Sequence, residues 1–289
     1  MNILVTGGLG FVGSHLVELL LSEGHSVTVI DSLVSESSSR DNIREGATYW
    51  IDDIRNINSA KYVEDASFDI VFHLAALARI QPSFKDPTKY FSIDAMGTAE
   101  VLEYTRRCSA KLVYAGSSSA YGGPMLNPYA FAKFTGEQLC EMYSKVYGMS
   151  TVIARFFNVY GPRQPISGPY ATVVGVFEGQ TLRQEPITVT GTGEQRRDFT
   201  HVKDIVGGLN ALSAGTFSGD VFNLGTGKNY SINELAAMFK PDNISYIPAR
   251  PGEAKTTLAD IESTTSATGW TPQFSLGDYV QEFINSNSN

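Results

Sequence analysis

The feature that most constrains the fold is the stretch from Met1 to Asp31, in which two apolar runs flank a glycine-rich loop. Residues 2–6 and residues 26–30 have the composition of short buried strands. Between them, the glycine-rich run from Gly7 to Gly13 leads into a helical pattern at residues 14–21. A strand, a glycine loop, a helix, a second strand and a terminal acid together predict a βαβ unit.

A βαβ unit of this kind is suited to binding a dinucleotide. Glycines let the backbone approach a pyrophosphate, and the helix N-terminus offers free N–H groups and the positive end of a dipole. Asp31 follows Gly13 by 18 residues and can accept both hydrogen bonds of an adenosine ribose diol, which favours NAD over NADP. The other reading is a Rossmann domain that has lost its ligand. The cofactor contacts expected in this unit are Gly7, Gly10, Phe11, Val12, Gly13, Asp31 and Ser32.

The bulk composition is that of a soluble globular enzyme of 289 residues. A net charge of −8 and a pI of about 5.1 argue against nucleic acids and anionic membranes as partners. Two cysteines make no disulfide framework, and no apolar run approaches the roughly 18 residues of a membrane span. Because the N-terminus begins with a predicted strand, we expect no signal peptide and a cytoplasmic location.

The rest of the chain predicts an α/β fold, a doubly wound parallel Rossmann sheet with a smaller C-terminal substrate-binding lobe. Further strands are expected at residues 49–51, 68–74, 111–115 and 150–157, and helices at 87–107 and 128–147. After residue 163 the regular alternation of strands and helices ends, and elements are expected at 202–214, 221–224, 232–239 and 244–247. We therefore expect an NAD-binding domain at 1–163, with 200–225 returning to it, and a nucleotide-sugar lobe at 164–199 and 226–289.

Residues at two other strand ends are placed to meet a cofactor. Asp53 and Ile54 follow the third strand and could flank the adenine, although a capped turn explains the same pattern. Leu74, Ala75 and Ala76 follow the fourth strand, where small residues leave space for a ligand. The preceding His73 is expected to be a hydrogen-bonded strand residue rather than a catalyst, and the serine-rich loop at 35–40 is expected to be solvated.

Three residues predict a catalytic group. Tyr129 and Lys133 are four apart at the start of a predicted helix, so they share one face. A phenol titrates at about 10, too high for a base at neutral pH, but an ammonium and a cationic nicotinamide would both lower the pKa of Tyr129. Lys133 could also hold the nicotinamide ribose, and Ser117, at the preceding strand end, could orient the reacting oxygen. No metal ligands are expected.

These motifs resemble the extended short-chain dehydrogenase/reductase family, in its nucleotide-sugar epimerase and dehydratase branch, and most closely its UDP-hexose 4-epimerases. The resemblance covers nearly the whole chain. It rests on residues 6–13, 73–76, 117–122, 128–133, 155–164, 197–202 and 250–253.

The resemblance implies a set of substrate contacts. Asn158, Arg197 and Arg250 would hold the diphosphate, and Glu253 the nucleotide ribose. Arginines suit phosphate oxygens and an acid suits a diol, although surface salt bridges are the other reading of these arginines. Thr257, four residues after Glu253, stands where relatives limit the sugar pocket, and its small side chain favours N-acetylated as well as plain hexoses.

The residues that follow Ser117 distinguish the enzyme types within this family. Dehydratases follow this position with Asp-Glu, and decarboxylases carry glutamate where this chain has Ser119; here Ser118 and Ser119 are neutral hydroxyls, which are poor acids for ejecting water. The resemblance therefore implies an NAD-dependent 4-epimerase of a UDP-hexose or UDP-N-acetylhexosamine that works through a 4-keto intermediate, with Tyr129, Ser117, Ser118 and Ser119 at the sugar. A UDP-glucuronate 4-epimerase, a 4,6-dehydratase, a decarboxylase or a non-catalytic NAD sensor remain alternatives.

Two further expectations come with the resemblance. Asp94 stands where the family usually has asparagine, which places a carboxyl near Lys133, and the loop between Tyr121 and Tyr129 is shorter than usual. The helices at 90–107 and 129–147 carry more apolar residues than one buried face needs, which predicts a homodimer.

Overall fold

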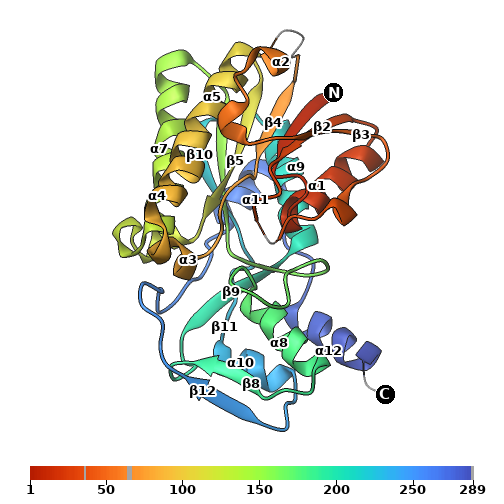
Figure 1. Cartoon of the computed structure of the whole chain (residues 1–289), viewed down its shortest axis with the longest axis vertical. Helices are drawn as coiled ribbons and strands as arrows, with labels where there is room; N and C mark the ends of the chain where they lie inside the picture. The colour runs from red at the N-terminus through yellow and green to blue at the C-terminus, as the bar shows by residue number, and fades with distance from the viewer. Residues whose placement is uncertain (36, 64–66, 288–289) are drawn as a thin grey trace.

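The computed structural model describes residues 1–35, 37–63 and 67–287. Its largest element is a seven-stranded sheet in the order β10-β6-β5-β4-β1-β2-β3, in which every neighbouring pair is parallel (Figure 1). The predicted doubly wound α/β sheet is therefore confirmed. Its strands are β1 (Asn2–Thr6), β2 (Ser26–Asp31), β3 (Ala47–Ile51), β4 (Ile70–His73), β5 (Lys111–Ser117), β6 (Thr151–Phe156) and β10 (Ser218–Leu224).

Helices cover both faces of this sheet and give it two apolar layers. On one face, Leu16 of α1 (Phe11–Ser22) and Leu209 of α9 (Val202–Ala214) share a core cluster with Val5. On the other, the cluster contains Leu102 and Cys140, from α5 (Gly97–Arg107) and α7 (Pro128–Tyr147). Burial on both faces explains why the strands read as continuous apolar runs.

The expected helix at 87–107 contains an irregular turn. It begins as α4 (Pro87–Tyr90), passes through a π-helical segment at Phe91–Met96, and continues as α5. Single π-turns inside helices are rare and frequently mark functional sites. This one carries Asp94, whose side chain is buried.

A smaller unit lies beyond the carboxyl ends of the large sheet (Figure 1). It has one sheet in the order β11-β9-β7 and another of β12 and β8, with a separate apolar core that includes Phe177, Phe199 and Leu235. The expected strand at 150–157 is in fact two strands, because the chain leaves the large sheet at Phe157 and β7 joins the small one. The elements of this unit are β7 (Asn158–Tyr160), α8 (Val173–Leu182), β8 (Ile187–Thr190), β9 (Arg196–His201), β11 (Asn229–Ser231), α10 (Ile232–Met238), β12 (Ile244–Ile247) and α12 (Leu276–Asn287).

The remaining elements are short helices and turns. They are the 3₁₀ turns Arg40–Asn42, Ile54–Asn56 and Pro124–Leu126, and the helices α2 (Ala60–Val63), α3 (Ile80–Lys85), α6 (Ser119–Gly122) and α11 (Glu262–Thr268).

After residue 163 the chain returns to the large sheet in two places. Helix α9 and strand β10 pack on this sheet. Trp270, in the tail expected to belong to the nucleotide-sugar lobe, also lies in the core of the large sheet, and its Nε1 donates to the Asp204 carbonyl of α9 at 3.0 Å. Polar sequence around 260–270 concealed this single buried aromatic anchor.

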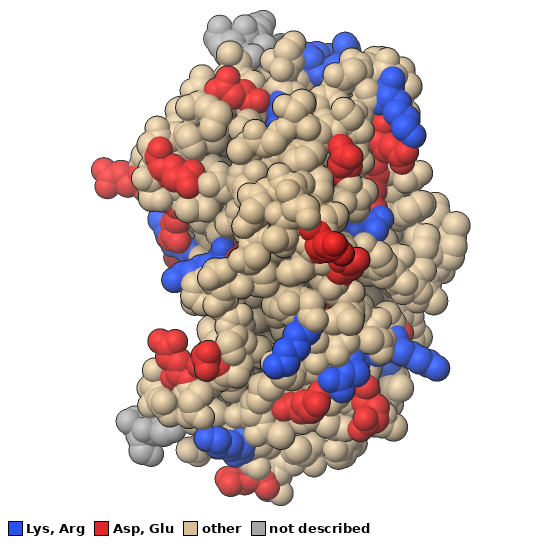
Figure 2. All heavy atoms as spheres, turned by 180° about the vertical axis from the view of Figure 1, so that it is seen from behind, with Lys and Arg blue, Asp and Glu red and all other residues tan. Residues whose placement is uncertain are grey.

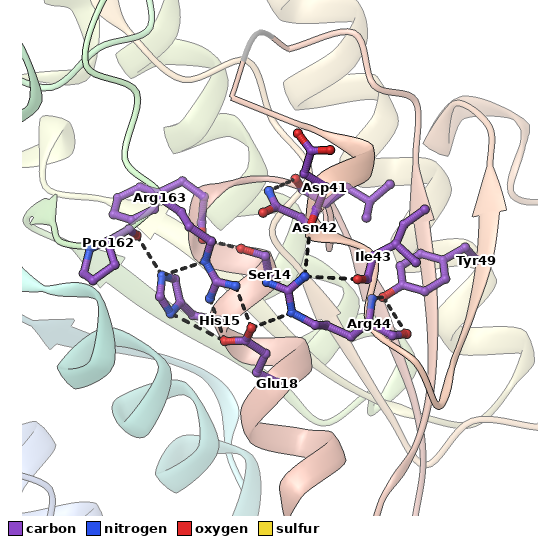
Figure 3. Close-up of polar contacts among 12 residues, drawn as sticks. Ser14, His15, Glu18, Asp41, Asn42, Ile43, Arg44, Tyr49, Pro162 and Arg163 are labelled. Atoms are coloured by element: carbon purple, nitrogen blue, oxygen red, sulfur yellow. Dashed lines mark hydrogen bonds and ion pairs between the residues drawn. The ribbon is translucent and has the colours of Figure 1, made fainter. Parts of the chain in front are cut away.

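An ion cluster ties α1 to the turn after β7 (Figure 3). Glu18 accepts a bidentate pair of hydrogen bonds from Arg163, at 2.6 and 2.7 Å, and a third from Arg44 Nε at 2.5 Å. The two guanidiniums, Arg163 first, lower the pKa of Glu18 to about 2. The helix that follows the glycine loop is thus fixed to the segment that leads into the smaller unit.

Charged residues of both signs are interspersed on the face shown in Figure 2. Among the described residues, no helix is long and apolar enough to cross a membrane.

Candidate active site

A cavity of about 470 Å³ lies between the carboxyl ends of the large sheet and the smaller unit. Ligands of open α/β sheets bind in this position. Every residue proposed from the sequence as a cofactor, catalytic or substrate residue lines it. These are Gly7, Gly10, Phe11, Val12, Gly13, Asp31, Ser32, Asp53, Ile54, Leu74, Ala75, Ala76, Ser117, Ser118, Ser119, Tyr129, Lys133, Asn158, Arg197, Arg250, Glu253 and Thr257.

The glycine loop is packed too tightly for side chains. A Cβ on Gly7 would lie 2.8 Å from the Ala75 backbone, and one on Gly13 would lie 2.1 Å from the Gly7 carbonyl oxygen. Gly7 also has φ +73°, which glycine adopts without strain. The loop therefore presents bare backbone at the N-terminus of α1, as a pyrophosphate requires, and the residues present fit a dinucleotide.

Asp31 is held at the end of β2 with its carboxylate toward the cavity. Its oxygens accept from the Leu9 N–H at 3.0 Å and the Leu33 N–H at 2.8 Å. Burial raises the pKa of Asp31, while these two hydrogen bonds and one from Ser38 oppose the rise. In the serine-rich loop, which was expected to be solvated or mobile rather than functional, Ser35, Ser37 and Ser38 are partly exposed and line the cavity.

Asp53 forms the capped turn that was one of the two readings of this segment. Its side chain caps the 3₁₀ turn that begins at Ile54 by accepting from the Arg55 N–H at 2.9 Å. Both Asp53 and Ile54 also line the cavity.

His73 is buried and fully hydrogen-bonded. Thr98 Oγ1 donates to the Asp94 carbonyl at 2.6 Å, so it accepts from His73 Nε2 at 3.0 Å, and Nδ1 then accepts from Thr6 Oγ1 at 2.7 Å. Burial lowers the pKa of His73 to about 3. This neutral imidazole joins β1, β4 and α5 and has no spare nitrogen for catalysis.

The proposed catalytic hydroxyls converge on one oxygen. Ser117 Oγ accepts from the Tyr129 phenol at 3.4 Å, from the Ser119 hydroxyl at 2.9 Å and from the Ser119 N–H at 3.2 Å. Because all three groups donate to Ser117 Oγ, the proton of Ser117 is left for a group in the cavity. The helix that carries Tyr129 begins as predicted, with Pro128 at its first position and Asn127 accepting from the Ala130 N–H.

Lys133 and Asp94 are two buried titratable groups that interact with one another. Burial lowers the pKa of Lys133, and the Asp94 carboxyl opposes this. The Asp94 Oδ1 accepts from the Leu77 N–H at 2.8 Å, while Oδ2 has no partner among the described residues. Burial raises the pKa of Asp94 to about 7, against the attraction of Lys133. The sequence identified the position, and the structure shows that its carboxyl is enclosed.

The pKa of Tyr129 differs from the expectation. Burial raises it above 10, and only the Ser117 hydrogen bond and the Arg79 guanidinium oppose the rise appreciably. The protein alone therefore does not supply the lowering that the sequence predicted for the phenol.

The substrate residues lie at the other end of the cavity. Arg197 is buried, and its Nη2 lies 3.5 Å from Glu253 Oε2, so it is no surface salt bridge. Arg250 is exposed at the rim of the cavity. The Thr257 side chain is 6% exposed, and its Oγ1 has no partner among the described residues.

The sequence missed several cavity residues, including the charged Arg79 and its contact Tyr170. Arg79 Nε donates to the Tyr170 carbonyl at 2.9 Å. No motif pointed to either residue, because Arg79 lies in a loop and Tyr170 in an irregular stretch before α8.

The chain is similar to nucleotide-sugar epimerases along its whole length. It is 32% identical to a putative UDP-glucose 4-epimerase of Methanocaldococcus jannaschii over 303 residues, which cover 98% of this chain and 97% of the relative. The UDP-glucose 4-epimerase of Thermotoga maritima, solved with UDP-glucose, matches with a TM-score of 0.93 and 29% identity over 100% of both chains.

A UDP-glucuronic acid 4-epimerase of Bacillus cereus, solved with UDP-glucuronic acid and NAD, matches with a TM-score of 0.89 and 30% identity over 99% of each chain. Residues 3–225 match the NAD dependent epimerase/dehydratase family. NAD is the cofactor of that family, and the glycine loop described above has the geometry for it. The chain therefore belongs to the NAD dependent epimerase/dehydratase family.

Proposed function

We propose that this protein is a 4-epimerase that inverts C4 of a UDP-hexose or UDP-N-acetylhexosamine. The observation that carries the proposal is the convergence of Tyr129 and Ser119 on Ser117 in the same cavity as the glycine loop. Bound NAD would supply the acceptor and donor of hydride, held by the glycine loop, Asp31 and Lys133.

The chain's own groups would handle the proton and the orientation of the sugar. Tyr129 would take the proton of the C4 hydroxyl as general base. Ser117 would donate to the same sugar oxygen and hold it in place. Lys133 would supply positive charge beside the phenol, and Arg197, Arg250 and Asn158 would bind the diphosphate.

The neighbours of Ser117 favour inversion over elimination. Ser118 and Ser119 carry neutral hydroxyls, so no carboxyl at these positions is available to eject water from the sugar. A non-catalytic NAD sensor would leave the converging hydroxyls of Tyr129, Ser117 and Ser119 without an evident role.

The side chain of Thr257 limits the size of the sugar that the cavity could hold. Its side chain is small and lines the cavity, which would leave room for an acetamido group. We therefore expect UDP-N-acetylhexosamines to be epimerised at least as well as UDP-glucose or UDP-galactose.

The proposal includes a homodimer formed through the helices near 90–107 and 129–147. These helices expose large apolar side chains, which in a dimer would be buried. They are Phe91, Met96, Phe131, Met142, Val146 and Tyr147. The two cysteines are free, as is usual in a reducing compartment, and a cytoplasmic location fits them.

The test is a panel of UDP-sugars incubated with the NAD-loaded protein, with C4 inversion followed by NMR. The Tyr129→Phe variant should retain NAD and the fold but lose most turnover, because only the phenolic oxygen is removed. Tyr246→Phe, at an exposed tyrosine of the smaller unit, is the matched control. Undiminished turnover in Tyr129→Phe would exclude Tyr129 as the base.

A further inference from the structure

Arg79 is a cation in the cavity without an anionic partner. It lies in the loop after β4 and immediately precedes α3. Its Nε donates to the Tyr170 carbonyl at 2.9 Å, and its remaining guanidinium N–H groups make no hydrogen bond or ion pair with the described residues. By contrast, the buried guanidinium of Arg197 faces the carboxylate of Glu253.

Arg79 lies near Tyr129, because it immediately precedes α3 and the Tyr129 N–H donates to Ser83 Oγ of α3 at 3.2 Å. Its guanidinium interacts electrostatically with the phenols of Tyr129 and Tyr90, whose rings meet edge to face with centroids 6.3 Å apart. Tyr129 is the residue proposed to act at C4, so a charge near its phenol is near the sugar. Arg197 and Arg250 are already proposed to bind the diphosphate, so Arg79 is not needed for it.

The backbone at Arg79 is also unusual. Its φ of 114° and ψ of 138° lie in a region that glycine adopts freely and other residues rarely do. Such strain persists where the surroundings hold a residue in place, and it clusters at ligand-binding sites. A glycine here would relieve the strain but would remove the charge.

A partly buried guanidinium without a counter-charge among the described residues is unfavourable, and a carboxylate is the ligand that best offsets it. The planar fork of arginine matches the two oxygens of a carboxylate, with charge-assisted hydrogen bonds. We propose that Arg79 binds a carboxylate carried by the sugar, so that the preferred substrates are UDP-activated uronic acids. This inference rests on the proposed function and extends its substrates to UDP-uronic acids, which should bind more tightly than the neutral UDP-sugars named above.

The test compares UDP-glucuronate with UDP-glucose, which differ only at C6 of the sugar. Dissociation constants are measured by calorimetry on NAD-loaded Tyr129→Phe protein, which cannot turn the ligands over, with and without Arg79→Gln. We expect UDP-glucuronate to bind more tightly, and Arg79→Gln to weaken it by about 10- to 100-fold, the loss of a charged hydrogen-bonded pair. UDP-glucose and UDP should change by less than about threefold.

Two further variants serve as controls. Arg79→Gly suits the backbone at this position, so it should fold and should show the same selective loss of UDP-glucuronate. Arg183→Gln, at an exposed arginine paired with Glu185, should leave all three affinities unchanged.

Two other outcomes overturn the inference, and a third separates it from the proposed function. Equal losses for UDP-glucuronate, UDP-glucose and UDP would assign Arg79 to the diphosphate. Unchanged affinities, with a lower kcat for all sugars and a shifted pH profile in the Arg79→Gln single variant, would make it a positioning residue for Tyr129. Selective binding of UDP-glucuronate without C4 inversion of any UDP-sugar would preserve the Arg79 assignment and refute the proposed function.

Discussion

The enclosed carboxyl of Asp94 makes the stability of the protein depend on pH, and Asp94→Asn should remove that dependence. The side chain is 1% exposed, and Oδ2 has no partner among the described residues. Asparagine keeps an oxygen for the Leu77 N–H and has nearly the same shape, so the substitution removes the charge with little change in packing.

The magnitude follows from the pKa of the buried carboxyl. Burial, the largest cause, raises the pKa of Asp94 from 3.8 to about 7, against the opposing effects of Lys133 and the Leu77 N–H. Because the folded state holds this proton more tightly than the unfolded state, its contribution to stability is complete below about pH 4 and is lost as the pH rises through 7. The full loss corresponds to about 4 kcal/mol in the free energy of unfolding.

The assay is urea unfolding of the NAD-free protein at several pH values, since bound NAD would add stability of its own. Asp94→Asn should be more stable than the parent by about 2 kcal/mol at pH 5 and by about 4 kcal/mol at pH 8. Asp242→Asn, at an exposed aspartate, should show no such trend. An equal gain at pH 5 and pH 8, or none, would refute the argument that Asp94 is buried uncharged near neutrality.

Four other predictions concern the cofactor, the sugar, the core and the assembly. Asp31→Ala should weaken NAD binding, measured by calorimetry, by about 1–3 kcal/mol, and comparable affinity of the parent for NAD and NADP would contradict the role of Asp31. Thr257→Tyr should suppress turnover of UDP-N-acetylhexosamines more than that of UDP-glucose by steric exclusion, so equal losses would rule out gating. Glu137→Gln should lower the free energy of unfolding by about 3 kcal/mol, because Glu137 makes a buried bidentate pair with Arg155 at 2.6–3.2 Å; a loss under 1 kcal/mol would show that Arg155 finds water instead. Sedimentation should show a dimer at micromolar concentration, and a monomer would count against the interface proposed for the helices near 90–107 and 129–147.

The large sheet was predictable for two reasons. Its strands are buried on both faces and therefore read as apolar runs, and the glycine loop after β1 is typical of a βαβ unit. Helix α8 was not predicted, since it contains two glycines and several β-branched residues, which are weak helix formers. The structure shows why the glycines are there. A Cβ on Gly175 would lie 2.3 Å from the Pro165 carbonyl oxygen, and one on Gly179 would lie 2.4 Å from that of Ile166. Tertiary packing, which local sequence does not reveal, outweighs propensity in this helix.

Some residues of the candidate site could likewise be predicted from the sequence, and others could not. Residues in motifs at strand ends, such as Ser117 and Asp31, could be placed from the sequence because the carboxyl ends of parallel strands lie at one edge of the sheet. Arg79 could not, because it is singled out by a backbone φ of 114° and by the lack of an ion pair with any described residue, which only coordinates show. The ionisation of Tyr129 also required the structure, since it depends on how deeply the phenol is buried.

The return of α9 and β10 to the large sheet means that neither half of this protein can be obtained by cutting the chain once. A fragment ending at residue 163 would lack β10, leaving the edge of β6 open to pairing with other molecules. It would also lack α9, so that Leu16 and its apolar neighbours on α1 would face water. Such a fragment should aggregate rather than bind NAD as a free-standing module. For the same reason, a new sugar specificity is more readily reached by substitutions around the cavity than by exchanging the C-terminal segment with that of a relative.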